Sequence, residues 1–330
     1  MCCLFGMIDG NHRFTGKQKA RMLHVQATAS EVRGTDATGI AYNSGGKLHV
    51  FKRPLPAHKV RFHIPEDALV IMGHTRMSTQ GDARRNYNNH PFLARAGSQS
   101  FALAHNGVLY NDVLLRTTQK LPRTNIETDS FVAVQLLQQQ GTLTFDSLRY
   151  MAEQVEGSFS FTVLDDRNNL YFVKGDNPLC IYHYPDSGLY LYASTEEILR
   201  KALARMPYRL GKASQVVLAC GEILKIDSEG QQTRAGFDTW NLYTRGYAPY
   251  SFLMEPSVRS RCVPLPASPD QAYIRELKSV ASFYGFSPDY VDTLLADGFT
   301  TDDVEEMLYC GDIRKNGAAC PDRGTGQGPI

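Results

Sequence analysis

The sequence predicts an α+β domain followed by a small all-α module. Short apolar runs bounded by turn residues predict buried strands, and the clearest of them are 2–7, 68–76 and 101–105. Amphipathic patterns with helical spacing lie between these strands and after them. Near residue 235 both patterns stop, and five prolines within 249–269 predict an extended linker.

The first part of the chain alternates strands with one helix. Residues 17–32 carry apolar side chains at helical spacing. The segment 43–46, Asn-Ser-Gly-Gly, predicts a hairpin turn between strands at 40–42 and 48–52. The stretch 77–100 is polar and contains Gly, Asn and Pro, so we expect a loop there.

The middle of the chain predicts two helices and then a meander of strands. The helices are expected at 128–138 and 145–153. Four alternating segments separated by turn sequences predict strands at 158–164, 169–174, 179–184 and 189–193. A short helix at 196–204 and strands at 216–218 and 221–226 complete this part.

Three short helical patterns follow the linker, at 271–284, 288–296 and 302–309. Ser287-Pro288 is typical of a helix start, since Ser caps the helix and Pro suits its first position. The sequence after residue 311 is rich in Gly and Pro, which predicts disorder. The expected organisation is a first domain, a linker, a three-helix module and a disordered tail, at 1–235, 236–270, 271–311 and 312–330.

Composition and charge exclude several classes of function. The 35 Lys and Arg residues nearly balance the 34 Asp and Glu residues, so no basic footprint for nucleic acid or an anionic membrane is present. No apolar run approaches the roughly 18 residues that a membrane span needs. The 7 cysteines are scattered without a C-x-x-C pair. We expect a cytoplasmic protein with reduced thiols and no cofactor.

The histidines 74, 90 and 105 are candidate metal ligands. They lack the i, i+4 spacing that places two ligands on one helix face, and histidines in cores or loops are commoner. We therefore expect no metal site. Solvated surface positions are expected for Asn125, Glu127, Gln135, Gln138, Gln139 and Gln140.

The first seven residues, Met-Cys-Cys-Leu-Phe-Gly-Met, carry the strongest chemical signal. Removal of Met1 would place a thiol and a free α-amino group together on Cys2. A thiolate is a strong nucleophile, and an α-amino group titrates at about 7.7–8.0, so it can act as general base. A lipid-modified end, a metal-binding pair and two buried thiols are the alternative readings.

Three later segments complete a candidate site. Arg76 ends a buried strand, where an arginine grips an anion or forms a structural ion pair. Asn106 and Gly107 form either an ordinary turn or the two donors of an oxyanion hole. Asp129 offers a carboxylate at a helix entrance, where it could also be a cap. An amino-acid substrate with a side-chain amide would need this cation, this anion and these donors around a nucleophile.

The ordered set resembles the glutaminase domain of class II glutamine amidotransferases, which are N-terminal nucleophile (Ntn) hydrolases. The shared motifs are C-x-L-F-G at 2–6, R-G-x-D-x-x-G at 33–39, G-H-T-R at 73–76, H-N-G at 105–107, T-D-S at 128–130 and K-G-x-x-P at 174–178. Their order and spacing agree over residues 2 to about 230. The resemblance implies a four-layer αββα sandwich for 1–235, with two sheets face to face between helical layers.

The resemblance also implies how the reaction proceeds. Cys2 attacks the side-chain amide of glutamine and forms a thioester, with its own α-amino group as base. Asn106 and the Gly107 N–H form the oxyanion hole.

The resemblance implies that the remaining site residues bind the substrate or support the site. Arg76 binds the α-carboxylate of glutamine, and Asp129 binds its α-ammonium group. Thr79 lines the same pocket. Arg33 braces the N-terminal strand.

Three positions depart from the family pattern. Cys3 stands where the family usually has Gly, and Met77 and Gln80 stand where it often has Trp and His. An amidase for another amide and a catalytically idle glutamine-binding scaffold or sensor therefore remain alternatives.

About one hundred residues follow residue 230, too few for the synthase domains of the family. We expect the ammonia to reach a synthase partner protein or to be released, and a homo-oligomer remains open. The C-terminal helices are similar to a three-helix ubiquitin-associated-type module, which would dock a partner or cap the first domain.

Overall fold

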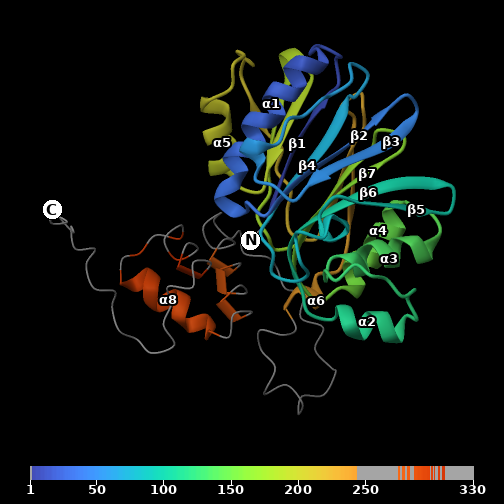
Figure 1. Ribbon diagram of the computed structural model, residues 1–330, viewed down its shortest axis with the longest axis vertical. Coiled ribbons are helices and arrows are strands. Elements are labelled where there is room, and N and C mark those ends of the chain that lie inside the picture. The colour runs from blue at the N-terminus through green and yellow to red at the C-terminus, as the bar shows by residue number, and fades with distance from the viewer. Residues whose placement is uncertain are drawn as a thin grey trace, which may run out of the picture. The chain divides into compact units, whose positions relative to one another are not determined.

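The computed structural model describes residues 2–243 and, between 274 and 308, residues 274–275, 277–278, 281–282, 286–297, 299, 301, 304 and 307–308. The chain divides into two compact units, Met1–Ala272 and Tyr273–Ile330. In Figure 1 the first unit contains two sheets with helices beside them. The predicted tail and most of the predicted linker lie outside the described residues.

The first unit is built on two antiparallel sheets. The larger sheet has the strand order β11-β9-β10-β1-β4-β2-β3. Its strands are β1 (Cys3–Asp9), β2 (Ala37–Ser44), β3 (Lys47–Arg53), β4 (Val70–Arg76), β9 (Cys180–Tyr184), β10 (Leu189–Ala193) and β11 (Ser214–Gln215). The smaller sheet has the order β13-β12-β8-β7-β6-β5. Its strands are β5 (Phe92–Ala96), β6 (Gln99–Leu109), β7 (Gly157–Asp165), β8 (Leu170–Lys174), β12 (Glu222–Ile226) and β13 (Gln232–Gly236).

Strand β1 is buried on both faces, which explains its continuous apolar sequence. Its side chains alternate because successive residues of a strand point to opposite faces. Phe5 and Met7 join the core beneath helices, whereas Leu4 and Ile8 join the core between the sheets. Residues of the smaller sheet, including Phe172, share that inner core.

Helices cover the outer faces of both sheets. Helices α1 (Gly16–Ala29) and α5 (Glu196–Ala204) pack on the larger sheet, and α3 (Phe131–Gln140) and α4 (Phe145–Gln154) pack on the smaller one. Helix, sheet, sheet and helix therefore follow one another, which confirms the predicted αββα sandwich. Thr15 and Thr144 begin α1 and α4 with reciprocal capping boxes, which satisfy backbone N–H groups at these helix ends.

Several local expectations differ from the structure. The strand expected at 216–218 is wrong, because β11 ends at Gln215. Val216 still donates to the Ile181 carbonyl oxygen and Leu218 is buried between the sheets, but Val217 is 71% exposed and the ladder goes no further. The expected loop 77–100 contains β5, which forms a hairpin with β6. The helix expected at 17–32 ends as α1 at Ala29 and continues as a 3-10 turn, η1 (Ser30–Arg33).

The remaining short elements connect these layers. They are α2 (Asp112–Thr118), α6 (Trp240–Tyr243), η2 (Ala57–Lys59), η3 (Asn86–Asn88) and η4 (Pro185–Ser187). Helix α6 lies within the range expected to be linker and packs near α4.

The second unit contains α8 (Pro288–Ala296), which begins as predicted with Ser287 as its N-cap. Val291 and Leu294 of this helix are buried. The other two predicted helices lie partly outside the described residues. Within the part of the chain that the structure describes, no helix has the length and apolar content needed to cross a membrane.

Candidate active site

The candidate nucleophile, Cys2, directly precedes β1, the central strand of the larger sheet. Cys3 pairs with Thr75 of β4 and is fully buried, so the backbone that follows Cys2 is held in place. The Cys2 Sγ lies 3.5 Å from the Met77 carbonyl oxygen, to which it donates. Burial raises the pKa of the Cys2 thiol, and the charge of Arg76 partly opposes this effect. A base is therefore needed to form the thiolate.

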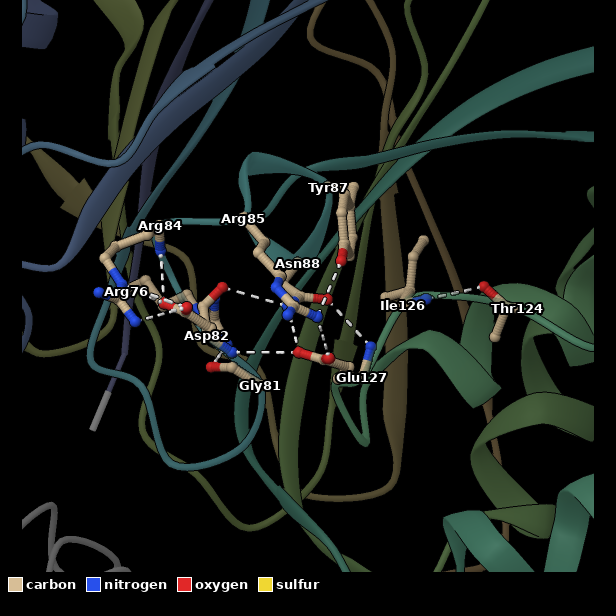
Figure 2. Close-up of polar contacts among 10 residues, drawn as sticks. All are labelled: Arg76, Gly81, Asp82, Arg84, Arg85, Tyr87, Asn88, Thr124, Ile126 and Glu127. Atoms are coloured by element: carbon tan, nitrogen blue, oxygen red, sulfur yellow. Dashed lines mark hydrogen bonds and ion pairs between the residues drawn. The ribbon is translucent and has the colours of Figure 1, made fainter.

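Arg76 ends β4 and is only 2% exposed. Its Nη1 donates to Oδ1 of Asn89 at 2.7 Å, and its Nη2 donates to the carbonyl oxygens of Gln80 and Gly81 at 2.6 and 3.1 Å. Figure 2 shows the guanidinium beside Gly81. The protein thus fixes the orientation of the cation and shapes the loop after β4 around it.

A second set of contacts holds this loop from the opposite side. The Glu127 carboxylate accepts from the Asp82 N–H, the Asn88 amide and the Arg85 guanidinium, at 3.3, 2.8 and 2.7 Å. The Glu127 N–H in turn donates to Asn88 Oδ1 at 2.9 Å. Figure 2 shows these residues as one connected network. The hydrogen bond from Asn88 lowers the pKa of Glu127. The Glu127 side chain is 40% exposed, as expected of a surface residue, but its carboxylate also holds this loop.

The R-G-x-D segment braces the same loop from the larger sheet. A Cβ on Gly34 would lie 2.4 Å from the Arg76 carbonyl carbon, so only glycine permits this approach. The Asp36 N–H donates to the Arg76 carbonyl, and its carboxylate accepts from the Ser78 N–H at 2.7 Å. Arg33 is 1% exposed at the end of η1.

Thr79 lies in this loop, next to Gln80, and is partly buried. The loop position beside an Arg76 contact is compatible with the pocket-lining role expected for it.

Asn106 and Gly107 lie near the end of β6. The Asn106 side chain is fully buried, and neither its Nδ2 nor its Oδ1 has a partner among the described residues. Gly107 has φ +140°, and a Cβ there would lie 1.9 Å from the Ser158 carbonyl oxygen. A glycine is thus required on steric grounds. A buried amide without a partner costs about 1–3 kcal/mol, which a ligand oxygen could offset.

Asp129 lies before α3 and is 5% exposed. Its Oδ2 accepts from the Leu109 N–H at 2.7 Å, and its Oδ1 accepts from the Ser130 hydroxyl at 3.3 Å. Burial raises the pKa of its carboxyl group. Asp129 therefore also anchors the end of β6, two residues beyond Gly107.

The strand ends meet at one place. The His74 Nε2 lies 3.0 Å from the His105 carbonyl oxygen, so the end of β4 lies beside the end of β6. Arg76 and Asp129 both influence the pKa of Cys2. The structure therefore brings the proposed nucleophile, cation and anion into one electrostatic neighbourhood, near the Asn106-Gly107 segment.

The three buried histidines pack beneath this site. The His74 and His90 rings are 4.3 Å apart, and His105 stacks on Phe161 at 4.6 Å. Burial lowers the pKa of His74 and of His105 to about 3. Residues 2–243 and the described part of the second unit contain no group of three His, Cys, Asp or Glu side chains that could hold a metal.

Comparison with known proteins agrees with this geometry. Residues 74–201 match the family model described as a glutamine amidotransferase domain. The glutamine–fructose-6-phosphate aminotransferase (isomerizing) of Staphylococcus epidermidis is 34% identical over 161 residues, which are 46% of this chain and 26% of that protein. This chain carries a glutamine amidotransferase domain.

Further comparisons extend the amidotransferase match over more of the chain. The glutamine–fructose-6-phosphate aminotransferase of Clostridium acetobutylicum is 26% identical over 229 residues, which are 66% of this chain and 36% of that protein. The structure of the glutamine phosphoribosylpyrophosphate amidotransferase from B. subtilis aligns with a TM-score of 0.57 at 23% identity, over 72% of this chain and 49% of that one. That likeness shows the shared fold. The chain spans only about a quarter to a third of the curated relatives it matches.

The structure also shows residues that the sequence reading missed. Asn89 and Glu127 hold the loop around Arg76, and Asn177 contacts the Asn106 backbone. Asn89 was visible only as one of several asparagines in a polar loop. Asn177 lies inside the K-G-x-x-P motif, which was the one available signal for it.

Proposed function

We propose that this amidotransferase domain hydrolyses the side-chain amide of glutamine and that Cys2 is the nucleophile. The buried Asn106 amide carries the proposal, because it lacks a partner among the described residues and lies beside Gly107, where the end of β6 adjoins the end of β4. Such paired donors stabilise the oxyanion of a tetrahedral intermediate.

The reaction would proceed through a thioester. The Cys2 thiolate adds to the amide carbon, and the carbonyl oxygen becomes an oxyanion held by Asn106 and the Gly107 N–H. The carbon–nitrogen bond then breaks, and the leaving nitrogen takes a proton and departs as ammonia. Water hydrolyses the thioester to glutamate and frees the thiol.

The base in this scheme is the α-amino group of Cys2, which becomes available when Met1 is removed. Burial raises the pKa of the thiol, so an unassisted thiol would remain protonated near neutral pH. An amine titrating at about 7.7–8.0 is well matched to take that proton and later deliver it to the leaving nitrogen.

Arg76 and Asp129 would select an α-amino acid. The Arg76 guanidinium would bind the α-carboxylate of the substrate, and the buried Asp129 carboxylate would pair with its α-ammonium group. Met77 and Gln80 adjoin this pocket and could change which side-chain length it prefers. Comparing the hydrolysis of glutamine with that of asparagine tests this preference.

The ammonia would serve an acceptor domain or a partner synthase. The amidotransferase family match supports this destination, and without an acceptor the isolated chain should release ammonia and glutamate in equal amounts.

The test is a glutaminase assay on purified protein whose N-terminal residue has been identified by mass. We expect active protein to lack Met1, Cys2→Ala to abolish glutamate release, and Cys3→Ala to retain most of it. The Cys3 variant is the matched control, since it removes the neighbouring thiol. Full activity of Cys2→Ala would exclude Cys2 as nucleophile, and glutamine binding without turnover in the native protein would identify a sensor instead.

A further inference from the structure

Asn177 contacts the peptide group that links Asn106 to Gly107. It lies after β8, in the turn that leads to β9, and is fully buried. Its Nδ2 donates to the Asn106 carbonyl oxygen at 2.7 Å. That oxygen and the Gly107 N–H belong to the same planar unit, so a contact to one end of the unit orients the other.

The Asn177 amide is itself held in one orientation. The Ser158 hydroxyl donates to its Oδ1, which leaves the Nδ2 facing Asn106. The Ser160 hydroxyl donates to the Asn177 carbonyl at 2.8 Å. Both serines belong to β7, which pairs directly with β6 and places Phe159 opposite Gly107. The amide therefore has little freedom to rotate.

The space around this peptide is also filled. A Cβ on Gly107 would lie 2.6 Å from the Asn177 Nδ2 as well as 1.9 Å from the Ser158 carbonyl oxygen. The Asn177 amide can therefore reach the 106–107 peptide group only because Gly107 has no side chain. Position 107 and position 177 are sterically matched.

We propose that Asn177 is a positioning residue for the oxyanion hole. Its hydrogen bond fixes the plane of the 106–107 peptide and, by drawing charge toward the carbonyl oxygen, makes the Gly107 N–H a stronger donor. This inference rests on the proposed function, because it concerns the donor that would hold the oxyanion. A residue that only stabilised the turn after β8 would affect folding but would not specifically lower kcat.

The test compares Asn177→Asp, Ser158→Ala and Asn106→Ala with the native enzyme in glutamine hydrolysis. Asn177→Asp keeps the shape of the side chain and removes the Nδ2 donor. Removing a direct oxyanion donor costs about 10²–10³ in kcat, so we expect a smaller loss, roughly 10-fold, for the indirect effect. KM should stay within about threefold, because substrate binding does not use this donor.

A pH series adds a readout that a structural role would not move. In Asn177→Asp, the new carboxyl group can donate to the Asn106 carbonyl again once it is protonated. The ratio of variant to native kcat should therefore rise as pH falls from 8 to 6. Ser158→Ala frees the amide but keeps the donor, and we expect it to lose kcat less than Asn177→Asp. It also serves if Asn177→Asp does not fold, since an unchanged kcat in Ser158→Ala would then count against the proposal.

Three outcomes overturn the inference, and they can be told apart. Native kcat in a folded Asn177→Asp variant, together with impaired Asn106→Ala, refutes the role of Asn177 and leaves the oxyanion hole intact. Native kcat in Asn106→Ala refutes the oxyanion hole itself, and this inference falls with it. Parallel losses of kcat and thermal stability with no pH dependence likewise refute the positioning role and identify Asn177 as a structural residue only.

Discussion

Arg76 donates to Asn89 over 2.7 Å, and both side chains are buried. Asn89 is held in turn by Lys52, whose Nζ donates to the Asn89 carbonyl oxygen at 2.5 Å. Burial lowers the pKa of Lys52 to about 8. The fold itself therefore orients the Arg76 guanidinium. Because this side chain is already fixed, it loses less conformational entropy when a substrate binds.

Replacing Arg76 should impair binding more than turnover. The contact proposed between Arg76 and the α-carboxylate would be present in both the ground state and the transition state, so its loss should raise KM with a lesser effect on kcat. For Arg76→Gln we expect KM to rise about 10-fold or more, as for a lost charge-assisted hydrogen bond. Arg84→Gln is the control, since that side chain is 90% exposed, and it should leave KM unchanged. A pure loss of kcat in Arg76→Gln would contradict the assignment.

Removal of the Glu127 carboxylate should loosen the loop around Arg76. Glu127→Ala deletes the contacts to Asp82, Asn88 and Arg85 together, so we expect a several-fold increase in KM and faster proteolysis within residues 77–89. Arg85→Ala removes an exposed ion pair, which contributes about 0–1 kcal/mol, and an exposed hydrogen bond to the Tyr87 hydroxyl, so it should change little. Equal kinetics of the two variants would show that the network does not shape the pocket.

His90 should make stability sensitive to acid. Burial lowers its pKa well below the ordinary value of about 6.5, so the folded protein holds it neutral while the unfolded chain protonates it. Its contribution is fully present above about pH 6.5 and is lost as pH falls below that value. His90→Phe removes no hydrogen bond made within the described residues, and its ring replaces the packing against His74 and Phe92.

Urea unfolding at pH 7, 6, 5 and 4.5 checks this prediction. The slope of unfolding free energy against pH should decrease by about one proton in His90→Phe relative to the native protein. Identical slopes in the two proteins would mean that His90 is protonated in the folded state.

A chain ending at residue 243 should retain glutamine hydrolysis. Every proposed site residue precedes residue 178, and α6, the last described element of the first unit, ends at Tyr243. We expect kcat and KM within about twofold of the full chain, measured after circular dichroism has established folding. A folded but inactive truncated chain would show that residues after 243 shape the site.

The sequence was sufficient for the fold class and for placing the candidate residues Cys2 and Arg76 at strand ends. Strands such as β1 and β4 are buried on both faces, so their apolar runs are unambiguous, and Cys2 and Arg76 adjoin their ends. The supporting residues were not predictable, because their partners lie far along the chain. Asn177 contacts Asn106 across 71 positions. Gln135 was also expected on the surface, yet it is 3% exposed and donates to the Pro122 carbonyl.

The central place of β1 in the larger sheet has a consequence for folding during synthesis. Its neighbours are β4 and β10, and Phe5 pairs with both Gly73 and Ala193. Contacts so distant along the chain form late, because the loop between them must close first. During synthesis from the N-terminus, the strand beside the thiol is made first but gains its second neighbour only after residue 193 emerges. The reactive end is thus assembled among the last parts of its own sheet, so a nascent chain would carry no competent site until most of the domain exists.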